Sequence, residues 1–483
     1  MARAKAVKSP EPSPGASRWT PGRRALVIFA WAFAVHLVTL LSSADRFAPV
    51  SAFFFGDGRL FFALGQALAD GRSLGAGLPY HPPLLPWLAA GCWSLFSSPS
   101  AVFLAGKLTM IVAAAATYAV FFRVIRERVP RAFWICLLLP LSFGELLLGL
   151  SLNSEVVYRL LLVLILWNGF ERPALCGALN GLAALARAEH LPFALAVAAF
   201  LAWRQPAQRR FVAVAAGVGL LVLAPYLAWT AHKLSDYNRQ HQARLAEPLP
   251  VFVPITFYGP LNFALAQREA EITFSRRSLP PAPGGATELD PTFPPHHEAI
   301  VHGYRLGFAA IADDPGRFLS RSLQKLALSA QALGHGWTWR DLPKDPQWTR
   351  PAVDLAYSPS TLATIFGLVL VLAGAWNLRD QRLFLLVGGV LLASRLGVNV
   401  AFFPYLRSVA VVAPFLLTLA LSGFAAPFRH HGRRVLQALL VLFAIFHFTT
   451  VFGDRRYLLE GERDGNGQII DDREVRIVLR ESS

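Results

Sequence analysis

The stretch RRALVIFAWAFAVHLVTLLSS, residues 23–43, decides the fold class. An apolar run of this length can cross the roughly 30 Å hydrocarbon core of a bilayer as one helix, and the arginines before it favour the cytoplasmic side. The run is too long, and too poorly followed by a small-residue cleavage site, for a simple signal peptide. We therefore expect residues 24–43 to be a first transmembrane helix that runs outward.

The same pattern repeats along the chain. Its 483 residues are 54% hydrophobic and only 16% charged, where soluble domains carry roughly a quarter charged residues, and the mean hydropathy is +0.43. The apolar runs lack the residue-by-residue alternation of a membrane β-barrel. The sequence therefore predicts an all-α polytopic membrane protein with about 11 transmembrane helices.

The formal net charge of +16 would suggest a nucleic-acid partner in a soluble protein. Here much of the excess lies in short loops between apolar runs, where the positive-inside rule accounts for it. We therefore expect these basic residues to interact with a lipid bilayer and not with a nucleic acid. The three cysteines have neither paired nor metal-ligand spacing, and we expect them to be packing residues.

The basic loops set the direction of each expected helix. The transmembrane helices are predicted at 24–43, 100–123, 132–150, 154–170, 174–188, 190–203, 211–231, 361–377, 383–400, 404–425 and 434–452. The chain then divides into a disordered cytoplasmic tail (1–23), an N-terminal transmembrane module (24–231) with a first outer loop (44–99), a long outer loop (232–360), a C-terminal transmembrane module (361–452) and an external tail (453–483). Membrane-surface helices are expected near 59–70, 82–97 and 315–333.

Polar residues of unusual position gather at the outer ends of these helices. Charged groups at or inside the bilayer boundary are costly, so they are functional candidates. The candidates are Asp57, His81, Glu155, Arg187, Glu189, Arg321, Lys325, Arg395 and Arg407.

Each candidate has a structural alternative that the sequence leaves open. Asp57 between two glycines could be a turn residue, and Glu155 could be a helix N-terminal charge favoured by the macrodipole. Arg187 and Glu189 could simply pair at a turn, and Lys325, like Arg407, could extend to lipid headgroups. His81 before two prolines is equally compatible with a structural role.

The candidates together favour one chemistry. A phosphate leaving group needs cations to hold the charge that develops on it, and arginine binds phosphate oxygens while staying charged. An acceptor hydroxyl needs a base, which one carboxylate can supply. The set therefore fits the transfer of a group from a lipid phosphate to a hydroxyl at the outer face.

Several stretches occur in an order that resembles the GT-C glycosyltransferases, in the bacterial branch related to protein O-mannosyltransferases and the lipid A aminoarabinose transferase. The resemblance covers roughly residues 24–425. It is carried by the Gly56-Asp57 loop, the Pro82-Pro83 turn, Glu155, LAALARAEHLPFALA (182–196), RFLSRSLQKLAL (317–328) and PYLRSVAVVAPFLLTLA (404–420).

The resemblance implies an inverting, polyprenyl-phosphate-sugar-dependent transferase in the bacterial cytoplasmic (inner) membrane, acting on a glycan, lipid or protein acceptor with its site facing the periplasm or exterior. It implies Asp57 as the catalytic base, Glu155 as a second acidic site residue and Arg407 as the ligand of the donor phosphate. Further phosphate-binding candidates are His81, Arg187, Arg321 and Lys325, and the substrate-binding candidates are Tyr80, Glu189 and Tyr405.

Two positions depart from the family pattern. Many relatives have an acidic pair where Gly58 follows Asp57, so no metal ligand set is predicted here and dependence on a divalent cation stays open. Some relatives have a lysine where this chain has His81.

The alternative function is a transporter or flippase of lipid-linked sugars, which would predict an inverted repeat; the chain shows no internal repeat. A non-catalytic scaffold would need neither Asp57 nor Glu155 beside basic residues.

Overall fold

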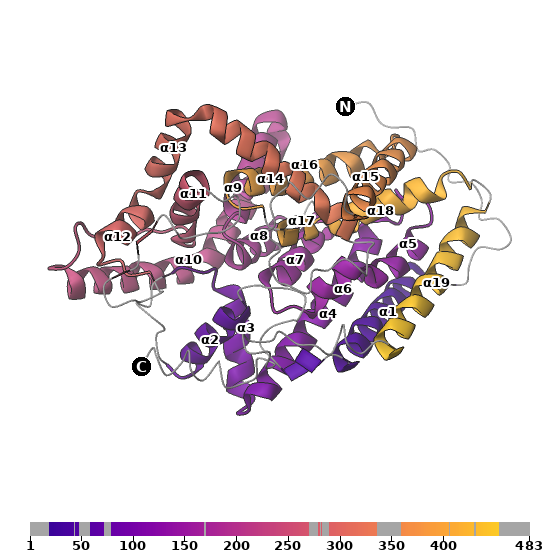
Figure 1. Ribbon diagram of the computed structural model, residues 1–483, viewed down its shortest axis with the longest axis horizontal. Helices are drawn as coiled ribbons and strands as arrows, with labels where there is room; N and C mark the ends of the chain where they lie inside the picture. The colour runs from indigo at the N-terminus through magenta and orange to yellow at the C-terminus, as the bar shows by residue number, and fades with distance from the viewer. Residues whose placement is uncertain are drawn as a thin grey trace.

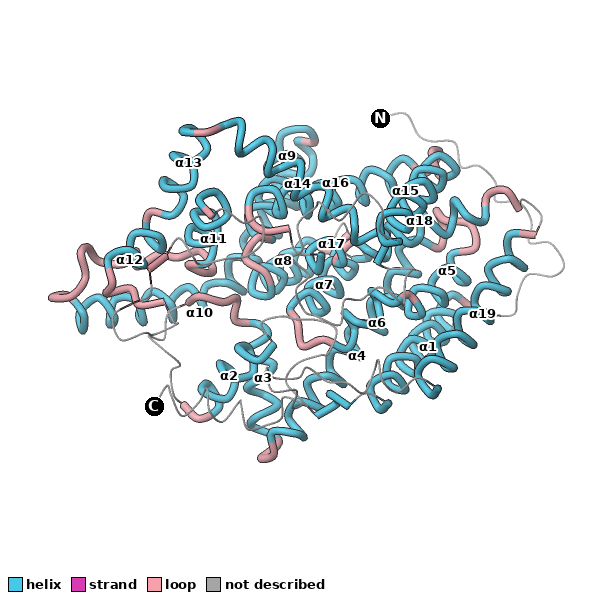
Figure 2. Tube along the Cα trace, in the orientation of Figure 1, coloured by secondary structure: helices cyan, strands magenta, loops and turns pink. Residues whose placement is uncertain are grey.

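The computed structural model describes residues 19–42, 44–47, 58–71, 79–168, 171–269, 279–280, 282, 289–335, 359–404, 406–428 and 431–453. Every regular element among these residues is a helix, and no strand occurs within them. Figures 1 and 2 show the helices packed side by side, with loops between them. The expected all-α fold class is confirmed.

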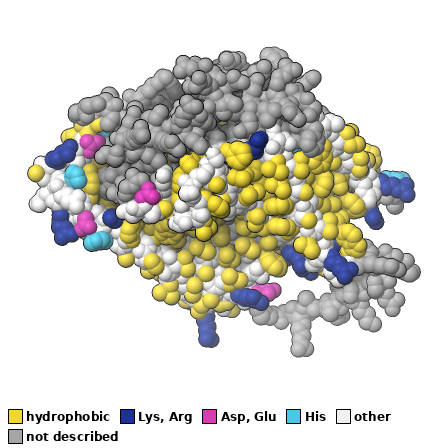
Figure 3. All heavy atoms as spheres, turned by 90° about the horizontal axis from the view of Figure 1, so that it is seen from below, with side chains coloured by type: hydrophobic (Ala, Val, Ile, Leu, Met, Phe, Trp, Pro, Cys, Tyr) yellow, Lys and Arg dark blue, Asp and Glu magenta, His cyan; other side chains and the backbone are white. Residues whose placement is uncertain are grey.

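Five helices are long and apolar enough to cross a bilayer, by length and composition. They are α1 (Pro21–Ser42), α4 (Pro99–Ile125), the segment Pro206–His241 that contains α10 (Arg209–His241), α16 (Arg382–Ala401) and the Gly432–Thr449 part of α19 (Gly432–Gly453). Figure 3 shows a face on which hydrophobic side chains cover most of the described area, with charged side chains at its margins. These features indicate a membrane protein.

The expected count of eleven transmembrane helices is not confirmed, because several apolar helices are short. The short ones of the N-terminal half are α7 (Ser154–Asn168), α8 (Pro173–Ala186) and α9 (His190–Arg204), with 15, 14 and 15 residues. At 1.5 Å per residue such a helix is about 22 Å long, against a hydrocarbon core of roughly 30 Å.

Two other expected transmembrane helices are interrupted. The 132–150 run forms α5 (Ala132–Leu138), a 3₁₀ turn (Leu139–Leu141) and α6 (Phe143–Leu150). The 404–425 run forms α17 (Leu406–Ala410) and α18 (Ala413–Ala425). Pro140 and Pro414 lie at these interruptions, and proline cannot donate the backbone hydrogen bond that a continuous helix needs.

The segment expected to be the first outer loop contains the two short helices that the sequence predicts. They are α2 (Gly58–Ala69) and α3 (Leu84–Leu95), and they pack against each other. Gly65 lies so close to Ala89 that a Cβ at position 65 would clash with it. Phe62 of α2 packs on Phe103 of α4, with ring centroids 5.6 Å apart. The pair therefore rests on the start of α4.

The segment expected to be the long outer loop (232–360), called the long outer segment below, holds more helices than the sequence predicts. The expected surface helix at 315–333 is α14 (Pro315–His335). The unexpected helices are α11 (Tyr258–Arg268), α12 (Pro294–Val301) and α13 (Gly303–Asp313). Gly303 and Gly307 let α13 pack directly on α11, where a side chain would meet Pro260 and Phe263. Short helices of this kind lack the long apolar periodicity that a sequence pattern can detect.

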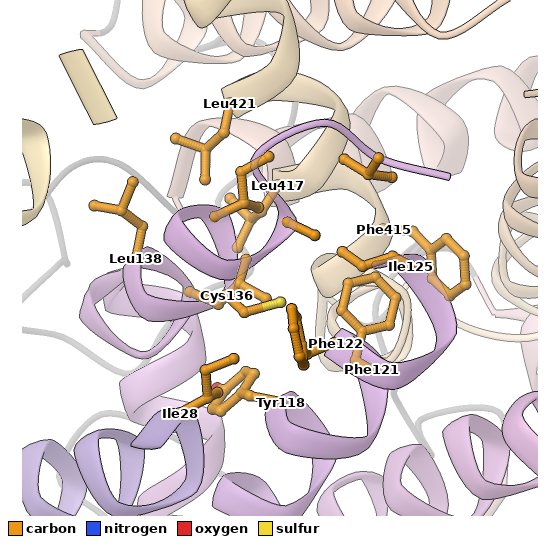
Figure 4. Close-up of a cluster of buried hydrophobic side chains, with 14 of the residues drawn as sticks. Ile28, Tyr118, Phe121, Phe122, Ile125, Cys136, Leu138, Phe415, Leu417 and Leu421 are labelled. Carbon is orange, nitrogen blue, oxygen red and sulfur yellow. The ribbon is translucent and has the colours of Figure 1, made fainter. Parts of the chain in front are cut away.

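One apolar cluster joins the N-terminal helices to the C-terminal ones. Figure 4 shows Ile28 of α1, Phe121 and Phe122 of α4, Cys136 of α5 and Phe415 of α18 in this cluster. The rings of Phe121 and Phe415 lie 5.0 Å apart. Another C-terminal helix, α15 (Pro359–Asn377), packs closely on α18. This core fixes α7 and α16 relative to each other, and these helices carry the site.

Candidate functional site

A chain of four ionised side chains joins α7, the α8–α9 turn and α16. Arg187 contacts the Glu155 carboxylate through Nη1 and donates from Nε to Oε1 of Glu189. Arg395 then donates from Nη1 to the same Glu189 oxygen, at 3.2 Å. We call Glu155, Arg187, Glu189 and Arg395 the ionic chain. It brings together four of the candidate residues that the sequence predicts.

Local backbone structure sets the directions of these side chains. Glu155 lies in the first turn of α7. Arg187 follows the last residue of α8 in an extended conformation, and Glu189 directly precedes α9. The His190 amide donates to the Arg187 carbonyl at 3.0 Å, which closes the turn between the two helices. This tight turn places both Arg187 and Glu189 beside the start of α7.

The ionic chain is buried at its two ends and half-open in the middle. The side chains of Glu155 and Arg395 are 1% and 2% exposed, whereas those of Arg187 and Glu189 are 15% and 19% exposed. Two carboxylates and two guanidinium groups sum to zero charge, which offsets the cost of burying each ion. The middle pair is therefore partly exposed to solvent.

Neutral polar groups orient the residues around the ionic chain. His190 Nε2 lies 2.9 Å from Oδ1 of Asn180, whose Nδ2 donates to the Cys176 carbonyl. A neutral His190 therefore donates from Nε2, and its Nδ1 accepts from the Tyr158 hydroxyl at 3.0 Å. The guanidinium of Arg395 stacks over the Tyr158 ring at 5.4 Å. Tyr158 thus supports Arg395 from the side.

A second buried ionic group lies deeper among the helices and was not predicted. Arg159 of α7 donates from Nη1 to both oxygens of Glu145 in α6, at 2.8 and 2.6 Å. The hydroxyl of Tyr118 in α4 donates to Glu145 Oε2 at 2.6 Å. The Glu145 and Arg159 side chains are each 1% exposed. We call Glu145 and Arg159 the inner ion pair. A charged residue within an apolar run was the signal that could have found it.

The predicted phosphate-binding residues of α14 bind backbone carbonyls. Lys325 donates to the carbonyls of Val400 and Phe402 at 3.1 and 2.6 Å. Arg321 donates to the Glu269 carbonyl at the end of α11. The α14 side chains are therefore engaged with the ends of two other helices.

Tyr80 and His81 belong to the expected first outer loop (44–99) and lie near its contact with the long outer segment. The Phe257 amide donates to the Pro79 carbonyl at 3.0 Å, and the Tyr80 ring packs 6.2 Å from the Phe257 ring. His81 packs edge-on against Phe61 of α2 at 5.4 Å. Leu84, just beyond, packs in an apolar cluster with residues of α7 and α8. The Pro82-Pro83 turn therefore lies near the helices that carry the ionic chain.

The three remaining predicted residues are described incompletely. Asp57 and Tyr405 lie outside the described residues, and so does the Arg407 side chain. The backbone of α17, which contains Arg407, packs against α7, α14 and α16. The residue after Asp57, Gly58, is buried at the start of α2. Among the described residues, which exclude Asp57, no group of three or more His, Cys, Asp or Glu side chains could hold a metal ion.

Comparison with protein-family models finds no match for this chain, and comparison with curated proteins finds none either.

Proposed function

We propose that this protein is a membrane glycosyltransferase that moves a sugar from a polyprenyl-phosphate donor to a hydroxyl acceptor, with inversion at the anomeric carbon. The observation that carries the proposal is the ionic chain, in which buried ends hold an accessible Arg187–Glu189 pair in place. Buried ionisable groups among membrane helices are expensive and mark functional sites. The GT-C-like order of stretches in the sequence supports the same activity.

In the proposed reaction Asp57 accepts the proton of the acceptor hydroxyl. The hydroxyl oxygen attacks the anomeric carbon of the sugar, and the bond from that carbon to the phosphate oxygen breaks. The polyprenyl phosphate leaves with the bonding electrons. Because a phosphate is stable as an anion, its departure needs no general acid. A cation near this oxygen stabilises the charge that develops on it.

The charge balance of the site favours Arg407 for that role. Within the ionic chain, Arg187 and Arg395 are already neutralised by Glu155 and Glu189. A donor phosphate brings further negative charge, and an additional cation must balance it. Arg407 lies on α17, which packs against α7. His81 is the second group assigned to the phosphate, as a hydrogen-bond donor. The ionic chain then orients the sugar through Glu189 and Arg187.

The first experiment identifies the substrates. Cell-envelope glycans of cells with and without the protein are compared by mass spectrometry, and we expect one sugar modification to depend on the protein. Transfer of that sugar is then measured in membranes that contain the Asp57→Asn variant.

We expect Asp57→Asn to abolish transfer at normal protein levels, because the amide cannot accept the proton. Asp70→Asn, at the exposed end of α2, is the matched control and keeps full activity. Full transfer by Asp57→Asn would exclude Asp57 as the base. If lipid-linked sugar instead accumulates on one side of the membrane without the protein, the flippase alternative replaces the transferase.

A further inference from the structure

The C-terminus of α16 is held by side chains from two helices of the long outer segment. Lys325 of α14 binds the carbonyls of Val400 and Phe402. Gln267 of α11 donates from Nε2 to the carbonyl of Ala401, at 2.7 Å. Three consecutive carbonyls at the end of one helix thus have donors from two others. We call Lys325 and Gln267 the α16 clamp.

The clamp suits the chemistry of a helix end. The last carbonyls of a helix have no partner within it, and the partial negative charge there favours a cation. Lys325 is 1% exposed and Gln267 is 8% exposed, so water contributes little at these carbonyls. A second contact strengthens the docking of α14, since Asn399 donates to the Ser329 hydroxyl at 2.8 Å. These contacts bond α14 directly to the end of α16, and we call this contact the α14–α16 joint.

The joint lies between two parts of the candidate site. On one side, α16 carries Arg395, which is bonded to Glu189 of the ionic chain. On the other side, the chain leaves α16 after Ala401 and begins α17 at Leu406. The position of the α16 end therefore decides where α17 begins. Since α14 also packs on α17, the outer segment contacts both sides of this link.

We propose that Lys325 and Gln267 are positioning residues that fix α17, and with it Arg407, relative to the ionic chain. The proposal rests on the proposed function only in that Arg407 is the expected phosphate ligand. Lys325 acts through the backbone of α16 rather than on the phosphate. The long outer segment is then coupled to the site, because a shift of α11 or α14 moves the carbonyls that they hold.

The test measures the burial of α17 directly, by the reactivity of a thiol at position 408. Ser408 is 2% exposed, and its hydroxyl has no hydrogen-bond partner among the described residues, so Ser408→Cys removes no bond within them. The native thiols are first removed by Cys92→Ala, Cys136→Ala and Cys176→Ala. The full-length protein in detergent is then labelled with N-ethylmaleimide.

We expect Lys325→Met to raise the labelling rate of Ser408→Cys by about tenfold or more, because it leaves two carbonyls at the end of α16 without their donor. Gln267→Leu removes one donor and gives a smaller increase. Lys325→Arg, which keeps a cationic donor, restores slow labelling at least in part. Unchanged labelling in both Lys325→Met and Gln267→Leu would overturn the proposal.

Two controls separate a local shift of α17 from general loosening. Ser422→Cys on α18 is also buried and without a hydroxyl partner among the described residues, so its labelling should stay slow in the Lys325→Met protein. Lys233→Met, which removes an exposed lysine from α10, should leave labelling at position 408 unchanged. Faster labelling at position 422 as well would show loosening of the helix bundle and overturn a positioning role.

A binding measurement separates this proposal from the proposed function. A short-chain polyprenyl monophosphate is titrated into the parent and Lys325→Met proteins. We expect the variant to bind it about tenfold more weakly, since a displaced α17 misplaces Arg407. Faster labelling at position 408 with unchanged phosphate affinity would retain the clamp and reject the Arg407 phosphate site.

Discussion

Two charged residues one turn apart on α7 belong to different groups. Glu155 and Arg159 have the spacing at which a helical acid and base can pair with each other, yet each has a partner on another helix. Arg159 is bonded to Glu145 of α6, and Glu155 contacts Arg187 of the α8–α9 turn. The comparison shows how one helix supplies charge both to the interior and to a site.

The two groups differ in how far they reach toward solvent. Both side chains of the inner ion pair are 1% exposed, while the middle residues of the ionic chain are 15% and 19% exposed. A closed pair contributes to structure, since no ligand can reach it. In the ionic chain, a ligand can contact the partly exposed Arg187 and Glu189 while the buried Glu155 and Arg395 stay fixed. Burial alone therefore does not identify the site, whereas the accessible part of a buried group does.

Arg159→Met should have the largest effect on stability. It leaves the Glu145 carboxylate at the centre of the helices without its cation, and breaking such a buried pair costs about 3–5 kcal/mol. We expect a corresponding fall in the free energy of unfolding, followed by tryptophan fluorescence in detergent. The double variant Glu145→Gln with Arg159→Met should recover part of this loss. A single variant as stable as the parent would show that the inner ion pair is not structural.

Arg187→Met should cost less stability and more activity. Arg187 is itself partly exposed and Arg395 remains beside Glu189, but the buried Glu155 carboxylate loses the cation that it contacts. The expected loss is therefore about 3 kcal/mol, the lower end of the cost of breaking a buried pair. Sugar transfer should fall by about a hundredfold, because Arg187 helps to orient the sugar and a misplacement of about 1 Å can cost that much. The amount of folded protein and its transfer rate are measured on the same sample. A loss of stability equal to that of Arg159→Met would erase the distinction between the two groups.

Lys325 provides a third kind of buried charge, held by carbonyls rather than by a carboxylate. Burial, and then the nearby Arg321 charge, lower the pKa of Lys325 to about 7. Above pH 7 the unfolded chain keeps this proton while the folded protein loses it. The free energy of unfolding therefore gains up to about 1.4 kcal/mol per pH unit from this group until the unfolded pKa, about 10.4, is reached.

The Lys325→Met variant lacks this contribution. Unfolding is measured between pH 6 and pH 10, roughly the window that these two pKa values define. The parent should gain stability relative to the variant as the pH rises above 7. Parallel pH profiles for the two proteins would mean that Lys325 does not titrate in this window.

An exposed ion pair gives the smallest expected effect and serves as the reference. Arg126 and Glu127 are 2.7 Å apart, with side chains 32% and 74% exposed. Exposed pairs contribute roughly 0–1 kcal/mol because water screens them. Glu127→Gln should change the free energy of unfolding by less than about 0.5 kcal/mol and leave transfer unchanged. A larger loss of unfolding free energy would indicate that Glu127 also interacts with charges other than that of Arg126.

Much of the helix pattern could be predicted from the sequence. The expected surface helix at 315–333 corresponds to α14, and the expected first transmembrane helix at 24–43 corresponds to α1. Apolar runs and their basic flanks are local features, so they appear in the sequence directly. The helices α11, α12 and α13 were missed because they are short and depend on contacts with one another.

The candidate site could be predicted only in part. Four residues were predicted from their expected position at helix ends and meet in the structure, namely Glu155, Arg187, Glu189 and Arg395. Glu145 and Arg159 were missed, although each is a charge within an apolar run. The partners of Lys325 could not be foreseen, because the carbonyls of Val400 and Phe402 carry no sequence signal.

The sequence by itself determined the all-helical class, the association with a membrane and the approximate bounds of most helices. Hydrophobic length and charge distribution act over a few turns, so they do not depend on the rest of the fold. Only the tertiary structure decided which charges pair. Glu155 contacts Arg187 rather than Arg159, one turn away, because the packing of α6, α7 and α8 turns each side chain toward a different neighbour.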